Sequence, residues 1–419
     1  MTTRALLSAK VTAAALERLA ATAKGELLLC LPHLSPTAPL VTPDLRDGGL
    51  ETWGDLLALL SRRGIDLRIL IADTDPLLSP DRHRAAWSHA SGFADVVQGE
   101  AQLVCATHGQ RATGLRARSL RRRLAPALAA LRAEDPARLT PVQRALLSTG
   151  PIPCPADIAQ SFAVADGLGA VIGGPDLGTD GPAGLALAVE DADFCGALRG
   201  QFADTWADAH SSGAPSLAAR IAPVACPARP QSREDLRLLR TLSRPQRGLG
   251  PRPFADDIEP TLSRLLGSAR RRVLIRTAAF RHDGLAQALA GTASPDSPEV
   301  TLLLPPATTG TWDDARASAL QATNLHLLQT AFGDRLTIRA DPTACEKATL
   351  CLIDDVTLLG SATLTRRACR WNTEAMVLAR DPDLTQALHA YVSAALTGGK
   401  TLETATPRHS RSWLPDDLF

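Results

Sequence analysis

The sequence predicts an α/β protein made of two tandem α-β-α sandwich halves that are related by pseudo-twofold symmetry. Three observations lead to this fold class. Runs of Val, Ile and Leu of strand length alternate with helical segments, which is typical of strands covered on both faces. The order of these segments in the first half of the chain recurs in the second half. A hairpin pattern, in which an Asp-led turn joins two apolar runs, occurs once in each half, at 160–177 and at 349–364.

Each half offers its elements in the same order, from a first strand to a closing helix. In the first half we expect strands at 26–34, 65–76 and 101–107, then the hairpin, then a strand at 184–191, with helices at 52–64 and 192–209. In the second half we expect strands at 270–280, 299–307 and 335–341, then the hairpin, then a strand at 373–381, with helices at 283–291, 315–332 and 384–396. Self-similarity of this kind predicts two copies of one structural unit.

Two internal segments fall outside the repeat. Residues 110–155 contain a basic helical insertion, and residues 211–250 form a linker rich in Pro, Ser and Arg. We therefore expect an N-terminal half at 1–210, a C-terminal half at 251–395 and a surface tail at 396–419.

Composition excludes several classes of protein. The chain has 419 residues, of which 45% are hydrophobic, so it can bury a sizeable core and is not disordered. Its net charge of +1 gives no global field that would attract nucleic acid or acidic membranes. The eight cysteines form no CxxC pair, which indicates free thiols and no zinc site. We expect no metal and no cofactor.

The distribution of polar residues bears on location. No stretch of about 18 apolar residues is uninterrupted, so no transmembrane helix is expected. The first 25 residues carry charges at helical spacing in place of a signal-peptide core, which predicts a cytoplasmic protein. His83 and His89 fall in a polar helix and are expected at the surface, and the arginines of 116–123 are expected to form a solvated helix face.

Several stretches, in the right order, resemble bacterial phospholipase D enzymes between about residues 25 and 395. The first hairpin "FAVADGLGAVIGG" with "LALAVEDADFCGALRGQFADTW" resembles the first catalytic half of that superfamily, and "LIDDVTLLGSATLTRRACRWNTEAMVLARD" resembles the second. The segments at 62–87 and 240–253 support the likeness. The resemblance implies two phospholipase D-like sandwich domains.

The resemblance also implies a mechanism. Each half of such enzymes supplies a His and a Lys that alternate on one strand, then an Asp, then a Gly-Gly or Gly-Ser pair. One His forms a covalent phosphohistidine and the other protonates the leaving alcohol. The two Lys bind phosphoryl oxygens, each Asp orients a His, and the small residues let the backbone approach the phosphate.

The first copy of this motif lacks its reactive groups. Counting back from Asp166, Ala159 stands in the His position and Ser161 in the Lys position. Gly173 and Gly174 match the small pair. Neither alanine nor serine can replace an imidazole or an ammonium group in these roles.

The second copy is degenerate in the same way. Counting back from Asp354, Lys347 stands in the His position and Thr349 in the Lys position. The turn is one residue shorter than usual, and counting from Gly360 would place Glu346 and Ala348 there. Gly360 and Ser361 match the small pair, Thr363 replaces the usual Asn, and Glu374 matches the acidic residue of the superfamily.

The leading hypothesis is a phospholipase D-like protein that has lost ordinary phosphodiesterase chemistry. It would bind a phosphate, a lipid headgroup or another phosphodiester ligand through the two small pairs and Lys347, or it would bind an active paralogue. The alternative is an active phospholipase D or phosphodiesterase with relocated residues. His33 and His282, which follow the first strand of each half at roughly matching places, are the candidates. Nucleic-acid binding through Arg111–Arg123 is a third hypothesis, disfavoured by the near-neutral charge.

Overall fold

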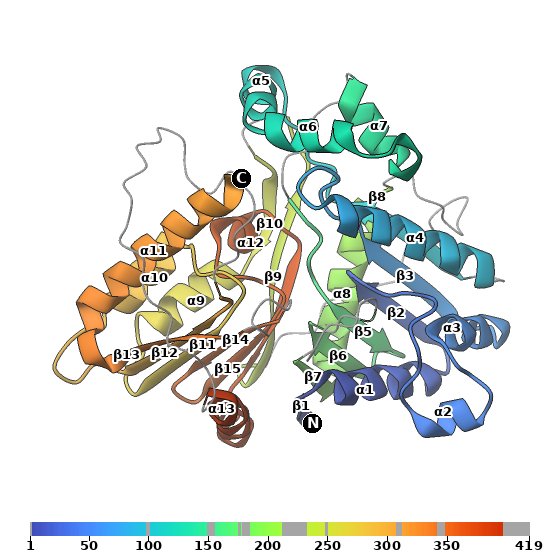
Figure 1. Cartoon of the computed structure of the whole chain (residues 1–419). Coiled ribbons are helices and arrows are strands. Elements are labelled where there is room, and N and C mark those ends of the chain that lie inside the picture. The colour runs from blue at the N-terminus through green and yellow to red at the C-terminus, as the bar shows by residue number, and fades with distance from the viewer. Residues whose placement is uncertain are drawn as a thin grey trace.

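Two eight-stranded mixed sheets lie next to each other, with helices packed on them (Figure 1). The computed structural model describes residues 2–97, 101–148, 156–174, 177, 185–211, 233–247, 250–306, 312–341 and 348–396.

The first sheet combines a parallel part with an antiparallel part. Its strands are, in spatial order, β1 (Thr2–Leu6), β7 (Ala186–Glu190), β6 (Gly169–Gly173), β5 (Phe162–Ala165), β2 (Glu26–Leu31), β3 (Asp66–Ala72), β4 (Gln102–Thr107) and β8 (His210–Ser211). Strands β2, β3 and β4 are parallel to one another, and the remaining neighbours pair antiparallel. The β5–β6 hairpin is the one that the sequence indicates.

The second sheet repeats this arrangement. Its strands are, in spatial order, β10 (Arg252–Asp256), β9 (Leu236–Arg244), β16 (Glu374–Ala379), β15 (Val356–Gly360), β14 (Thr349–Ile353), β11 (Arg272–Arg276), β12 (Glu299–Leu304) and β13 (Leu336–Ala340). The order β16-β15-β14-β11-β12-β13 matches β7-β6-β5-β2-β3-β4 strand for strand. The predicted fold class, an α/β protein of two sandwich halves, is confirmed.

Helices cover the sheets in matching places. The first half has α1 (Ala9–Ala21), α2 (Pro43–Asp47), α3 (Trp53–Arg62), α4 (Pro80–Val96) and α8 (Ala192–Asp208). The second half has α9 (Ile258–Leu266), α10 (Asp283–Ala290), α11 (Trp312–Phe332), α12 (Arg366–Arg370) and α13 (Pro382–Leu396). The inserted helices α5 (Gly114–Arg123), α6 (Ala125–Ala133) and α7 (Pro141–Ser148) pack around a small apolar cluster of their own, at the top of Figure 1.

The structure differs from the expected boundaries at two edges. Residues 236–244, assigned to the linker, form β9, which pairs with β16 and β10. Their arginines and serine suggested a linker, but Leu239 and Leu242 are buried on the sheet. At the start of the chain, Thr2–Leu6 form an edge strand ahead of the expected helix. Strand β1 is an edge strand and β9 is next to the edge strand β10, and both positions depend on pairing with a distant partner strand.

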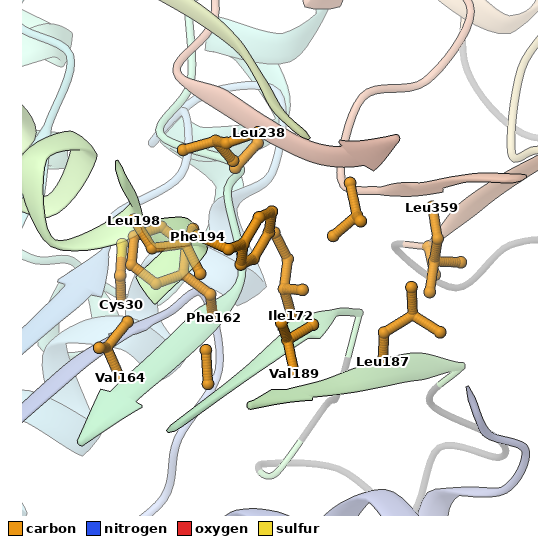
Figure 2. Close-up of a cluster of buried hydrophobic side chains, with 14 of the residues drawn as sticks. Cys30, Phe162, Val164, Ile172, Leu187, Val189, Phe194, Leu198, Leu238 and Leu359 are labelled. Atoms are coloured by element: carbon orange, nitrogen blue, oxygen red, sulfur yellow. The ribbon is translucent and has the colours of Figure 1, made fainter. Parts of the chain in front are cut away.

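The two halves share one hydrophobic core. Buried side chains of β5, β6 and β7 belong to the same cluster as those of β9, β14, β15 and β16. Figure 2 shows Phe162, Ile172 and Leu187 of the first sheet with Leu238 and Leu359 of the second. Burying each such side chain contributes about 1.5–3 kcal/mol, so this cluster joins the two sheets firmly. The two hairpins consequently lie close together, with β15 in contact with β6 and β7.

The motif aspartates hold the hairpin turns. Asp166 and Asp354 are the two non-glycine residues with positive φ among the described residues, at 54° and 52°. The Asp166 carboxylate accepts hydrogen bonds from the backbone N–H groups of Lys24, Gly25 and Glu26, at 2.9, 2.8 and 3.0 Å. Asp354 accepts the same set from 270–272 in the other half. Each aspartate therefore ties its turn to the start of the neighbouring strand.

Replacing Asp166 should show how much this tie contributes. Partial burial disfavours ionisation, but the N–H groups of Glu26, Lys24 and Gly25 outweigh it and lower the pKa of Asp166. Its stabilising effect is therefore present above the ordinary Asp pKa and is lost as pH falls through the lowered value. We expect Asp166→Ala to lose about 2–4 kcal/mol in urea unfolding at neutral pH, because three N–H groups lose their acceptor. Asp166→Asn, which keeps one oxygen and tolerates positive φ, should lose less, and equal losses would contradict this account.

Candidate functional site

The first degenerate motif begins at a junction between the halves. The segment before β5 runs beside the segment before β16, with a bridge between Ile158 and Thr373. The Thr373 N–H donates to the Asp157 carbonyl at 2.8 Å, and the N–H groups of Ala159 and Gln160 donate to the Thr373 carbonyl at 2.9 and 3.0 Å. These bonds join the two halves through their backbone, next to the residue in the His position of the first motif.

The first motif offers no reactive side chain at this junction. Ala159 has only a methyl group, and the Ser161 hydroxyl is buried without a hydrogen-bond partner in the described part of the chain. Gln160 between them turns into the core, where its amide binds Thr205 and Gln201. Asp166 lies at the opposite end of β5, in the turn.

The strand pairing settles how the second motif aligns with the first. Thr349 pairs with Gly360, just as Ser161 faces Gly173 through the N–H of Gly173. The shorter second turn arises because Ile353 pairs with Val356, whereas Ala165 pairs with Gly169. The missing residue is therefore in the turn, and counting from Asp354 gives the matching register.

The second motif likewise buries its hydroxyl. Thr349 is 1% exposed, and its Oγ1 lies 2.9 Å from Thr277 Oγ1. Ala348, the residue of the alternative count, is buried as well. Lys347 and Glu346 lie outside the described residues, so the role of Lys347 in binding a phosphate stays a prediction.

The glycines of the motifs are sites of close strand approach. A Cβ at Gly360 would lie 2.2 Å from the Ala375 carbonyl oxygen, and one at Gly173 would lie 2.5 Å from that of Leu185. Gly174 and Ser361 take equivalent places, since their N–H groups donate to the Leu185 and Ala375 carbonyls. Packing between strands thus requires the small residues, whether or not a phosphate binds there.

Glu374 is a titratable group whose pKa is shifted by burial near the second motif. It is 1% exposed, accepts from the Asn372 side chain at 2.8 Å and accepts from the Ser361 hydroxyl. Burial raises its pKa from 4.5 to about 7, against the lowering effect of those two hydrogen bonds. Asp157 raises the pKa further and Arg367 lowers it. Near neutral pH this carboxyl group can therefore exchange a proton.

The two candidate histidines do not occupy equivalent positions. The bridges Leu34–Leu177 and Phe280–Leu364 align Leu34 with Phe280, so His33 matches Ala279 and His282 lies further along. Both histidine side chains are buried instead of lying in solvent.

His282 has a structural task in the described residues. Its Nδ1 accepts from the Leu285 N–H at 3.3 Å and caps α10, and its Nε2 lies 3.2 Å from a Glu259 oxygen. Burial lowers the pKa of His282, although Glu259 opposes the shift. A helix cap that also contacts a carboxylate is a complete explanation for this residue.

A cavity beside the junction was not predicted from the sequence. It has a volume of about 280 Å³ and opens where β3 and β4 end, which is the usual side for ligands in α/β sheets. Its lining includes Asp73, Asp75, His83, Arg111 and Asp157. The stretch "ADTDP" directly after a buried strand was the signal that could have revealed it.

His83 fixes one wall of this cavity and is not a surface residue. It is fully buried, with Nδ1 2.6 Å from an Asp73 oxygen and Nε2 2.7 Å from Thr140 Oγ1. The other Asp73 oxygen accepts from Trp87 Nε1 at 3.2 Å. The expected surface position was wrong because Thr140, at the start of α7, covers this face of α4. The insertion is thereby fastened to the sheet.

The described residues contain no group of three His, Cys, Asp or Glu placed to hold a metal ion. In the same part of the chain, no helix has the length and apolar character needed to span a bilayer.

Comparison with known proteins identifies the fold. Residues 262–396 match the family described as cardiolipin synthase, PLD-like domain. The crystal structure of phosphatidylserine synthase from Haemophilus influenzae Rd KW20 is similar over 96% of this chain and 87% of that chain, with 12% identity and a TM-score of 0.58. Nuc from Salmonella typhimurium, a phospholipase D family member, is 14% identical over 40% of this chain and 97% of its own, with a TM-score of 0.29. Comparison of the sequence with curated proteins found no match.

The family match falls on the C-terminal half, which contains the second hairpin, Ser361 and Glu374. The likeness to phosphatidylserine synthase extends the fold over nearly the whole chain. Together with the matching strand order of the two halves, these findings show that residues 262–396 match the PLD-like domain family and that the chain as a whole has the fold seen in phosphatidylserine synthase.

Proposed function

We propose that this protein has lost the covalent phosphodiesterase chemistry of its superfamily and acts as a cytoplasmic binding module. The observation that carries the proposal is the identity of the residues in the motif positions, the half-buried Ala159 and the buried Ser161 and Thr349. None of them can form a phosphohistidine or neutralise a phosphoryl oxygen. Loss of a covalent nucleophile alone typically lowers a rate by several orders of magnitude.

The contact between the halves also involves the first motif. Backbone hydrogen bonds join Thr373 to residues 157–160, where the first motif begins. The retained scaffold suits binding of a phosphodiester or a phospholipid headgroup, since phosphatidylserine synthase has a similar fold. An active paralogue is the other candidate partner. Phosphatidylserine synthase shares the fold at 12% identity, so its reaction is not transferred to this chain.

Enzymatic activity with relocated residues is the second candidate. The pKa of Glu374, raised to about 7 by burial, favours it, because a group that titrates near neutrality can serve as acid or base. His33 and His282 would be its displaced acid–base pair.

Hydrolysis assays separate the two candidates. Purified protein is incubated with bis(4-nitrophenyl) phosphate and with phosphatidylcholine vesicles, beside a His33→Ala/His282→Asn double variant. Asparagine at 282 preserves a helix cap, so folding is retained. We expect no turnover above background in either protein. Turnover that the double variant abolishes would establish the enzyme, and a trapped phosphoryl-enzyme would refute the loss of chemistry whichever residue carried it.

A further inference from the structure

The cavity at the ends of β3 and β4 has an unbalanced set of charges. Three carboxylates line it, those of Asp73, Asp75 and Asp157, against one guanidinium group, that of Arg111. Asp73 is already engaged by His83 and Trp87, and Asp157 lies 3.3 Å from Arg367. Asp75 is the carboxylate that these contacts leave available.

Asp75 has hydrogen bonds but no cation. One of its oxygens accepts from the N–H groups of Leu77 and Leu78, at 2.8 and 2.9 Å. Among the described residues no Lys, Arg or His forms an ion pair with it. Beside it, the Thr74 hydroxyl oxygen is shielded from solvent and has no hydrogen-bond partner in the described part of the chain. Asp75 therefore lines the cavity without a cationic partner among the described residues, and burial raises its pKa despite the hydrogen bonds from Leu78 and Leu77.

An organic ammonium group is the cation that best fits beside Asp75. A metal ion does not fit, because no three His, Cys, Asp or Glu side chains among the described residues are placed to coordinate one. A quaternary ammonium group is usually held by aromatic rings, and no Phe, Tyr or Trp lines this cavity. A primary ammonium group, with three N–H donors, can satisfy both Asp75 and Thr74.

Arg111 gives the site a second, cationic end that can bind an anionic group. It lines the cavity, is exposed and therefore lies at the rim. Part of the lining, Asp73 and His83, is held by the buried Asp73–His83–Thr140 contacts, so this part of the cavity is preformed. A volume of about 280 Å³ lies at the small end of ligand pockets and suits a small molecule.

We propose that this cavity binds a small zwitterion, with a primary ammonium group at Asp75 and Thr74 and an anionic group at Arg111. The inference goes beyond the proposed function, since it rests on the cavity alone and holds whether or not the junction has catalytic activity.

Isothermal titration calorimetry on the full-length chain tests this site. Phosphoethanolamine, phosphocholine, ethanolamine and inorganic phosphate are the probes. We expect phosphoethanolamine to bind at least about tenfold more tightly than phosphocholine or inorganic phosphate. Arg111→Ala should weaken phosphoethanolamine but leave ethanolamine unchanged, because ethanolamine has no anionic group.

Asp75→Asn is the decisive variant, because asparagine keeps an oxygen for Leu77 and Leu78 while removing the charge. It should weaken phosphoethanolamine by at least about tenfold. Asp81→Asn, at an exposed carboxylate at the start of α4, is the matched control and should change nothing. Thr74→Val supplies a second test should Asp75→Asn fold poorly.

Three results would overturn the proposal. Equal affinity for phosphoethanolamine and inorganic phosphate would indicate an anion site only. Equal affinity for phosphocholine would exclude the primary ammonium contact. No binding of phosphoethanolamine at concentrations on the order of 10 mM would exclude the ligand class.

Discussion

Replacing Gly360 with alanine is expected to destabilise the protein by about 4 kcal/mol or more. The added Cβ would lie 2.2 Å from the Ala375 carbonyl oxygen and 2.5 Å from Met376 Cα, both of them backbone atoms of β16. Strand β16 lies inside the sheet between β15 and β9, so it cannot move away from the new methyl group without breaking a ladder. Urea unfolding followed by circular dichroism measures the loss, and insoluble expression would agree with it.

The control is Gly333→Ala. Gly333 has a φ of 56°, and no atom lies within 4 Å of an added Cβ. Only the backbone conformation opposes that substitution, at a cost of about 1 kcal/mol. A Gly360 variant no less stable than the Gly333 variant would mean that the two strands do not approach as closely as described.

The second large effect concerns Glu374 and pH. The pKa of this carboxyl is raised by burial from 4.5 in the ordinary case to about 7 in the folded protein. Between these values the folded state holds a proton that the unfolded state has released, so stability falls as pH rises. The difference corresponds to a loss on the order of 3 kcal/mol between pH 4.5 and pH 7.

Glu374→Gln should remove this dependence. Glutamine is uncharged at every pH, and its amide oxygen can still accept from Asn372. We expect the variant to be more stable than the wild type at pH 8, and its stability curve to be flatter between pH 5 and pH 8. Urea midpoints across that range provide the measurement, with the exposed Glu51→Gln as control. A wild-type stability that does not decline over this range would show that Glu374 is ionised in the folded protein without cost.

Much of the fold follows from local sequence patterns. The strands of the two parallel sections are nearly continuous apolar runs. A strand buried on both faces is apolar along its whole length, so its own residues are enough to predict it. The hairpins were equally readable, because Asp166 and Asp354 sit in turns that need a residue tolerant of positive φ. The correspondence between the halves followed from the order of the elements alone.

Two outer strands, β9 and β1, could not be predicted from local patterns in this way. Strand β9 alternates leucine with arginine and lies beside a Pro-rich segment, so composition pointed to a linker. Its place is decided by pairing with β16, a partner more than a hundred residues away in the chain. The same is true of β1, which pairs with β7.

In the candidate site, too, local patterns predicted some features, and others depended on distant residues. Spacing identified the motif positions and their lack of histidine, but it could not say which side of the short turn had lost a residue. The pairing of Thr349 with Gly360 answers that question. His83 was misjudged because its surroundings come from Asp73 and from Thr140 of the insertion, and no local pattern joins these three residues.

The shared core has a consequence for how the sequence can change over time. Leu187 of one sheet and Leu359 of the other belong to a single cluster, so a larger side chain at one position limits what the other can accommodate. A substitution at the interface in one half is therefore acceptable only if it fits the residues of the other half. For the same reason, neither half can be exchanged by recombination without the other. A half taken from a relative would have an interface that is complementary to a different partner half. We therefore expect more sequence variation on the outer helices than where the two sheets meet.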